Sequence, residues 1–201
     1  MYIAMDMKTR PYDMTGRQQA KCATRDGIVK AAIDCIMSER SFAVTLPAIA
    51  ERAGVTVKTI LRHFGSREAL IEAAWSQAHD EVRAERQATP GDSTGALRVL
   101  IDHYERRGLM VLAMLSEETE PRALRMTEAG KLGHRRWVEE VFAAHLPETT
   151  DTRSRLVDVL VVATDVYAWK LLRLDRGLTV DEVHDRMALM TAALLEQGVR
   201  P

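Results

Sequence analysis

Cysteine, proline and aromatic residues are scarce in this chain of 201 residues. It has two cysteines, six prolines and an aromatic content of 5%. Cys22 and Cys35 have neither CxxC spacing nor paired histidines around them, which argues against a zinc cluster or a disulfide framework. The few prolines, together with frequent alanine, leucine, arginine and glutamate, favour an all-α fold.

Long apolar runs and catalytic motifs are also missing. No stretch approaches the roughly 20 apolar residues of a membrane span, and the N-terminus does not resemble a signal peptide. We therefore expect a cytoplasmic protein with no membrane partner. There is no glycine-rich phosphate loop, GxSxG elbow or HExxH motif, so an all-α enzyme is disfavoured and we expect no cofactor and no metal site.

Charge is unevenly divided along the chain, although the net charge is only −1. Residues 1–67 hold eleven Lys and Arg against six Asp and Glu, whereas residues 68–201 hold 17 against 23. A basic N-terminal third suggests a head that binds a polyanion, attached to a body that does not. Chance segregation of surface charge is the alternative.

The first 23 residues show no helical period, so we interpret residues 1–23 as a flexible basic arm. Arg10, Arg17 and Lys21 in this arm could reach a minor groove, or could simply be disordered. A helix capped by Thr24 should follow and should end near Arg40.

Two short helices with the same start signal follow. Thr45 and Thr56 each come directly after a valine and four residues before an isoleucine, the spacing of a capping residue with a hydrophobic staple. Gly54 and Gly65 suit the left-handed ends of these helices. Together with the first helix, they predict a helix-turn-helix domain over residues 24–67.

The second short helix, residues 57–64, has two different faces. At about 100° per residue its apolar side chains fall within one arc of about 100°; they are Val57, Ile60, Leu61 and Phe64. The opposite face carries Lys58, Thr59, Arg62 and His63. A short helix with an outward basic face suits the major groove of DNA, whereas a solvated charged face is the ordinary alternative.

The segment TLPAIAERAGVTVKTILRHFGSREAL, residues 45–70, resembles the DNA-binding signature of TetR-family transcriptional regulators. The similarity covers residues 24 to about 75. It implies a homodimer that binds a palindromic DNA operator, usually represses transcription, and carries a helical domain for a small-molecule effector.

The resemblance also implies roles for individual residues. Thr45 and Thr56 match capping residues near phosphates, while His63 and Arg67 match backbone contacts. The base-facing positions match Val57, Lys58 and Thr59, and the helical wheel adds Arg62. Leu61 departs from the family, which commonly has a phosphate-contacting tyrosine there.

The remaining residues, 68–201, should form a helical domain for ligand binding and dimerisation, giving about nine helices in all. We expect a short helix from Pro121, separated at Gly130 or Gly133 from a further helix that reaches Leu146. A long helix should cover residues 156–174, and a last one should run from Thr179 to about Gln197.

The last two helices have apolar repeats that predict a four-helix dimer interface, with an intrachain core as the alternative. The predicted interface residues are Leu156, Leu160, Ala163, Tyr167, Leu171, Leu174, Val183, Met187, Met190 and Leu194.

Adaptable methionines and aromatic residues suggest a pocket for a hydrophobic effector, although such residues are also common in ordinary cores. The candidate pocket residues are His103, Tyr104, Met110, Met114, Trp137, Phe142, Asp165 and Trp169.

Taken together, the sequence predicts a dimeric DNA-binding repressor that a small hydrophobic molecule releases from its operator. A head that contacts protein instead of DNA, or a transcriptional activator, remains open at this point.

Overall fold

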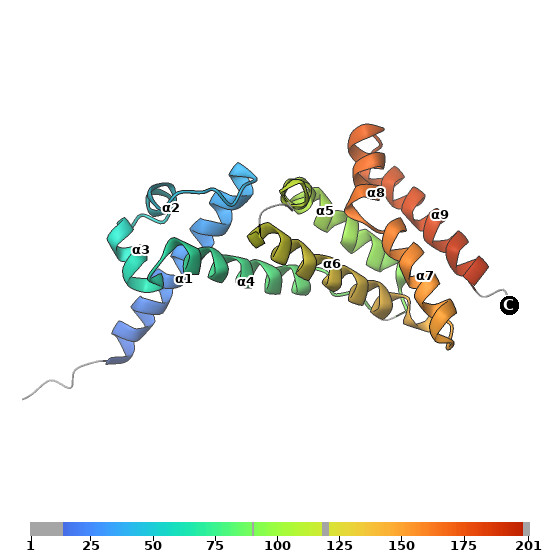
Figure 1. Cartoon of the computed structure of the whole chain (residues 1–201), viewed down its shortest axis with the longest axis horizontal. Coiled ribbons are helices and arrows are strands. Elements are labelled where there is room, and N and C mark those ends of the chain that lie inside the picture. Colours follow the sequence, from blue (N-terminus) through green and yellow to red (C-terminus); the bar gives the residue numbers. More distant parts are fainter. Residues whose placement is uncertain (1–13, 90, 118–120, 199–201) are drawn as a thin grey trace, which may run out of the picture.

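The structure, a computed structural model, describes residues 14–89, 91–117 and 121–198. Within these ranges every regular element is helical, which confirms the all-α prediction. A small three-helix head lies at one end of the molecule and the C-terminal helices lie at the other (Figure 1).

The head consists of α1 (Met14–Glu39), α2 (Leu46–Arg52) and α3 (Val57–Phe64). The Thr45 hydroxyl accepts a hydrogen bond from the Ala48 amide at 3.4 Å, and that of Thr56 accepts one from Thr59 at 3.1 Å. Both predicted caps are therefore confirmed. Gly54 and Gly65 follow the two helices at φ angles of 64° and 78°, a region that glycine enters without steric cost.

The start of α1 differs from the prediction. Residues 14–23 are helical, although we expected an arm up to residue 23. This first part of α1 is exposed over residues 18–23 and has no apolar stripe for periodicity to detect. Lys21 is thus an exposed helical residue, while Arg10 lies outside the described residues.

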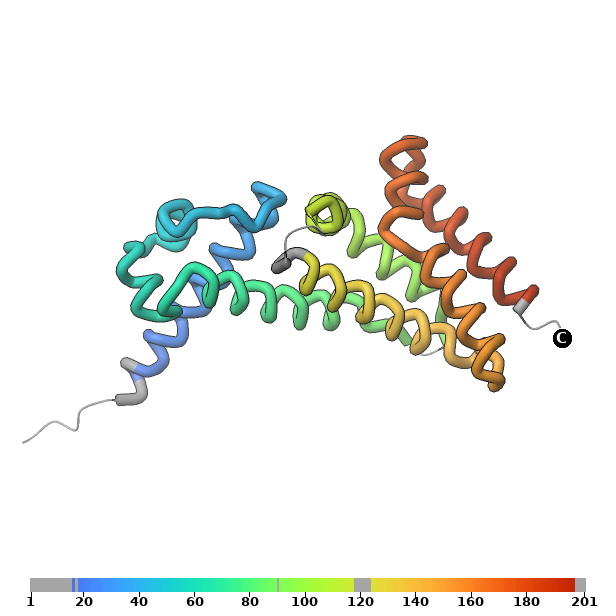
Figure 2. Tube along the Cα trace, viewed as in Figure 1, coloured from blue at the N-terminus to red at the C-terminus, as the bar shows by residue number. Residues whose placement is uncertain are grey.

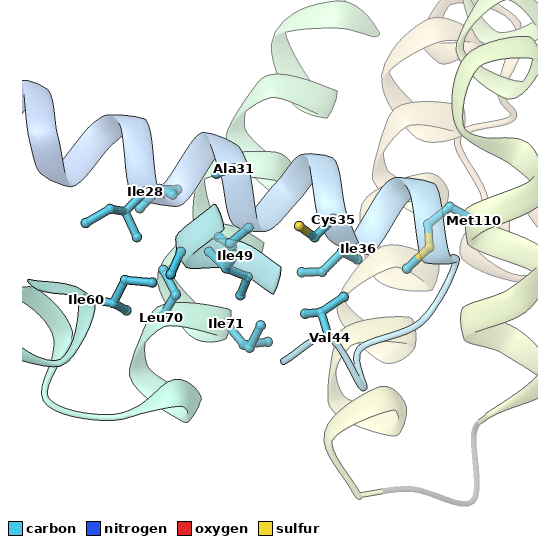
Figure 3. Packing of buried hydrophobic residues seen from close by; sticks show 14 of the residues in the cluster. Ile28, Ala31, Cys35, Ile36, Val44, Ile49, Ile60, Leu70, Ile71 and Met110 are labelled. Atoms are coloured by element: carbon cyan, nitrogen blue, oxygen red, sulfur yellow. The ribbon is translucent and has the colours of Figure 1, made fainter. Parts of the chain in front are cut away.

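The core of the head draws on more of the chain than residues 24–67. Ile28, Cys35, Ile49 and Ile60 pack together at its centre (Figure 3), and burial raises the pKa of the Cys35 thiol. The first half of α4 (Arg67–Glu85) joins this core through buried side chains; these are Leu70, Ile71 and Ala74. Helix α4 therefore belongs to the head at its start and to the body at its end.

The body contains α5 (Ser93–Ser116), α6 (Pro121–Val141), a 3-10 turn η1 (Ala143–His145), α7 (Thr150–Ala163), α8 (Val166–Lys170), the π-helical turn η2 (Leu171–Asp175) and α9 (Val180–Gly198). Their inner faces form a second hydrophobic core. The path of the chain through these helices can be followed in Figure 2.

Two predicted helix boundaries in the body are wrong. Helix α6 continues through Gly130 and Gly133, because a glycine lowers helix stability without ending the helix. The predicted helix over residues 156–174 is instead interrupted after Ala163. The Asp165 carboxylate accepts a hydrogen bond from the Tyr167 amide at 2.9 Å and caps a new helix, α8.

Candidate DNA-binding surface and ligand cleft

Helix α3 presents the basic face that its sequence predicts. Ile60 is fully buried beneath it, while Lys58 and Arg62 are exposed. Thr59 and His63 are half-buried at the edges of this face. The side chains that would meet a DNA groove are therefore held by a helix that is capped at its start and anchored by its apolar side.

The apolar arc of α3 is narrower than the helical wheel predicts. Val57 is half-buried against the head core, so its side chain is only partly available to a base. Leu61 is 40% exposed, and the expectation that it completes the buried face is wrong. The head core ends before reaching it, which leaves Leu61 on the outer surface beside Lys58 and Arg62.

Arg67 is tied to the protein itself. Its Nε donates a hydrogen bond to the Val44 carbonyl at 2.8 Å and its Nη2 donates one to the Phe42 carbonyl. Both carbonyls lie in the segment between α1 and α2, so the guanidinium joins this segment to the start of α4. A role of Arg67 in contacting phosphate stays a prediction.

Arg25 was not singled out from the sequence. Its guanidinium carbon lies 4.9 Å from the centre of the Phe64 ring, a cation–π contact that joins α1 to the end of α3. The two residues are far apart in sequence, so no local pattern could have revealed the pair.

A cleft of about 2110 Å³ extends from the C-terminal end of α1 along the body to exposed residues of the C-terminal helices, such as Val162 and Met190. Its walls come from the C-terminal end of α1, the second half of α4, and α5 to α9. Six of the eight predicted pocket residues line it; they are His103, Tyr104, Met110, Met114, Trp137 and Asp165.

The two other predicted pocket residues are core residues, a correction to the prediction. Phe142 is fully buried in the body core. Trp169 packs against the backbone of Gly108, and its Nε1 donates a hydrogen bond to Glu105 at 2.8 Å. Neither side chain therefore has a surface that faces the cleft.

The wall of the cleft includes a buried polar network that sequence analysis did not identify. Arg86 Nη2 lies 2.7 Å from His134 Nδ1, and the guanidinium carbon lies 4.9 Å from the centre of the Trp137 ring. His134 Nε2 is 3.1 Å from the Thr164 hydroxyl, which itself donates to the Leu160 carbonyl at 2.7 Å. Since Arg86 is a donor only, His134 accepts through Nδ1 and donates through Nε2.

These contacts set the charge of the histidines. Burial, together with the Arg86 charge, lowers the pKa of His134 to about 3 and that of His103 to about 4. Glu85 has its own cation, because Arg107 donates a hydrogen bond to it at 2.9 Å and holds its pKa at about 2. The network thus contains neutral imidazoles and an Arg–Glu pair beside a charged Arg86.

Metal binding finds no support in the described part of the chain, where no three His, Cys, Asp or Glu side chains are grouped to hold an ion. In the same residues no helix is long and apolar enough to cross a membrane.

Comparison with known proteins agrees with the architecture. The family model for bacterial regulatory proteins of the tetR family matches residues 28–74, which cover the C-terminal part of α1, all of α2 and α3, and the first turns of α4. The HTH-type transcriptional repressor KstR of Rhodococcus jostii (strain RHA1) is 27% identical over 167 residues, spanning 79% of this chain and 76% of its own. Residues 28–74 thus match the DNA-binding domain of the tetR family, and most of the chain is similar to a TetR-type repressor. The protein is accordingly a DNA-binding transcriptional regulator.

A solved structure shares the TetR fold over most of the chain. It is the crystal structure of a TetR-family transcriptional regulator from Rhodococcus sp., with a TM-score of 0.63 and 18% identity. The match covers 86% of this chain and 99% of the other. The body as well as the head therefore has the TetR fold.

The predicted interface residues on the C-terminal helices fall into two groups that differ in burial. Leu156, Leu160 and Ala163 on α7, and Val183 and Met187 on α9, are buried within the chain. Four of them pack in the core of the body and Ala163 lines the cleft, so they have little free surface to offer a second subunit.

The second group is exposed or half-buried, as an interface requires. Tyr167, Leu171, Leu174 and Met190 are exposed, and Leu194 is half-buried. Sequence analysis missed three more exposed apolar residues on the same helices, which are Val159 at 42%, Val162 at 71% and Leu189 at 67%. We name these exposed apolar side chains of α7, α8, η2 and α9 the C-terminal apolar face.

Proposed function

We propose that this protein is a dimeric repressor whose affinity for operator DNA falls when a small molecule binds in the cleft. The observation that carries the proposal is that the cleft and the head share residues. Met110 and Met114 line the cleft and also belong to the hydrophobic core of the head. A molecule that displaces them would therefore disturb the packing of the DNA-binding helices.

The proposed DNA contacts follow from the exposed face of α3. Lys58 and Arg62 are free to reach base edges, with Thr59 and the exposed part of Val57 beside them. Thr45 and Thr56 lie at the N-terminal ends of α2 and α3, where backbone amides and hydroxyls favour phosphate. His63 would contact the DNA backbone from the edge of α3.

The C-terminal apolar face supports a homodimer. Val162 and Leu189 are more than two-thirds exposed, and a cluster of such residues is a common sign of a protein interface. One recognition helix reads few base pairs, whereas two helices in a symmetric dimer read a palindrome. The second copy would bind at the end of the molecule opposite the head (Figure 1).

Helix α4 offers a physical route from the cleft to the DNA. Its first turns pack in the head core through Leu70 and Ile71, and its later residue Val82 lines the cleft. Because a helix transmits a displacement along its axis, an effector that moves the far end of α4 would turn the head. The shift in DNA affinity is limited by the difference in effector affinity between the two states.

Repression rather than activation is favoured by the relative from Rhodococcus jostii, which is described as a repressor.

The proposal is tested by selecting bound sites from a random DNA pool with the full-length protein. We expect an inverted repeat, and a particle of twice 22.6 kDa in analytical ultracentrifugation. Lys58→Ala should relax the preferred sequence at one or two positions of each half-site. A pool that shows no enrichment even at low salt would contradict DNA binding, and an unpaired half-site would contradict the dimer.

A further inference from the structure

Arg86 on the cleft wall carries a charge that the chain does not neutralise. Among the described residues, no carboxylate lies within 4.0 Å of its guanidinium, and its buried Nε has no hydrogen-bond partner. Its close partners are the neutral His134 imidazole and the Trp137 ring. An isolated cation that is removed from water is destabilising unless an anion accompanies it.

The neighbouring acidic groups are already engaged. Glu85 precedes Arg86 in sequence but pairs with Arg107 at 2.9 Å and with Arg106 at 3.6 Å. Of the two acids that line the cleft, Asp165 caps α8 through the Tyr167 amide. The other, Glu140, makes no ion pair with Arg86 within 4.0 Å among the described residues. An anion that neutralises Arg86 therefore has to be a group other than these carboxylates.

Basic side chains outnumber acidic ones in the lining of the cleft, and one of them, Arg107, is paired with Glu85. Five Lys and Arg line the cleft against two Asp and Glu, although residues 68–201 carry more acidic than basic side chains. The rest of the wall is largely apolar and includes Met110, Met114, Trp75 and Met126. An apolar cleft with a half-buried cation at one point fits a molecule that has an apolar body and one anionic end.

We propose that the effector of this regulator is an apolar carboxylate, and that its carboxylate binds the Arg86 guanidinium. This inference rests on the proposed function, since it takes the same cleft as the effector site. Trp137 and His134 act as positioning residues, because they fix the plane of the guanidinium from one face and one edge. A guanidinium in a partly dry site binds a carboxylate more strongly than in water.

The test compares three probes of equal chain length on the full-length protein by isothermal titration calorimetry. They are dodecanoate, dodecanol and dodecyltrimethylammonium, each below its micelle concentration. We expect dodecanoate to bind about tenfold or more tightly than dodecanol, the ratio that corresponds to one charge-assisted hydrogen bond. Dodecyltrimethylammonium should bind most weakly. In melting experiments, dodecanoate should raise the Tm more than dodecanol does.

Two variants locate the carboxylate. Arg86→Gln should bring the affinities of dodecanoate and dodecanol to within about twofold, whereas Arg86→Lys should keep only part of the preference, because an ammonium keeps the charge but does not stack on Trp137 as the guanidinium does. Arg98→Gln is the matched control, because it removes the same charge from an exposed position of α5 that pairs with Asp181. It should behave as wild type. If Arg86→Gln does not fold, the Arg86→Lys variant and the melting shifts of the wild type still test whether the carboxylate binds Arg86.

Equal binding of dodecanoate and dodecanol by the wild type would overturn the inference. So would binding of none of the three probes, or an unchanged preference in Arg86→Gln. Operator binding is measured on the same protein without any probe. A protein that binds its selected DNA but no carboxylate contradicts only this inference, whereas one that binds no DNA contradicts the proposed function.

Discussion

A Cβ atom placed on Gly108 would lie 2.6 Å from Cζ3 of Trp169. The absent side chain lets α5 and α8 approach closely, and the indole is fixed because its Nε1 donates to Glu105 and its ring is 2% exposed. Helix α5 continues through Gly108, and the close packing of Trp169 at this position requires a glycine.

We predict that Gly108→Ala destabilises the protein by about 1–3 kcal/mol, since the ring cannot move aside without losing its hydrogen bond. Urea unfolding measures the change. Gly130→Ala is the matched control, because Gly130 also lies within a helix and its Cβ would meet nothing within 4 Å. It should be neutral or stabilising by about 0.5–1 kcal/mol. Equal losses in the two variants would contradict the packing role of Gly108.

Substitutions at Arg67 and Lys58 should have different effects, the first mainly on stability and the second mainly on DNA binding. Arg67→Ala removes hydrogen bonds to the Val44 and Phe42 carbonyls and should lower the free energy of unfolding by about 1–3 kcal/mol. Lys58→Ala changes an exposed residue and should leave stability within about 0.5 kcal/mol while weakening operator binding.

Unfolding and salt-dependent DNA titrations on both variants check this. If Arg67 also contacts phosphate, its variant lowers the slope of log affinity against log salt by about one. A stable Arg67→Ala protein would show that the two carbonyl contacts contribute little.

The sequence was sufficient for the two short helices of the head because their start and end signals are local. Thr45, Thr56, Gly54 and Gly65 act on their nearest neighbours, and all four lie where expected. The break at Asp165 was also encoded locally, but the apolar run around it hid the capping residue.

The cleft and the C-terminal apolar face could not be derived in this way. A repeat of apolar residues does not tell which side faces the chain itself, so Leu160 and Val162 could be separated only by the packing. The Arg86 network joins residues that are far apart in sequence: Arg86 and His134 are 48 positions apart, and His134 and Thr164 are 30 positions apart. Such contacts depend on the whole arrangement of helices.

Acid should destabilise the protein well above the pH at which carboxylates titrate. His103 and His134 have pKa values lowered to about 4 and about 3 by burial and by Arg86, and both titrate near about 6.5 when unfolded. Above that pH both histidines are neutral in the folded and in the unfolded chain, so they do not make the free energy of unfolding depend on pH. As the pH falls towards 4, the unfolded chain binds protons that the folded protein does not, so stability decreases by about 1.4 kcal/mol per pH unit for each histidine.

Urea unfolding between pH 7.5 and pH 5 measures this slope. His134→Gln should reduce it, whereas His145→Gln, at an exposed position of η1, should leave it unchanged. A wild-type stability that is flat over this range would show that the two imidazoles do not stay neutral in the folded protein.

A charge on the C-terminal apolar face should separate the subunits. Val162→Asp and Leu189→Asp alter side chains that are 71% and 67% exposed, so each subunit should still fold. We expect a particle of half the mass in sedimentation and a loss of operator affinity of at least about tenfold, since one head then binds alone. Leu109→Asp is the control, as Leu109 is 42% exposed on α5, outside this face. Dimers that persist in both variants would place the interface elsewhere.

Leu61→Tyr should strengthen DNA binding. Leu61 is 40% exposed on α3 beside the basic face, so a larger ring replaces it without disturbing the head core. A tyrosine hydroxyl can donate to a phosphate, as the TetR-family resemblance implies for this position, and one such bond contributes about 0.5–1.5 kcal/mol. Because tyrosine is neutral, affinity should rise with no change in the salt slope. Leu61→Phe tests the hydroxyl itself: if it strengthens binding equally, the gain comes from apolar contact and the inferred phosphate bond is absent.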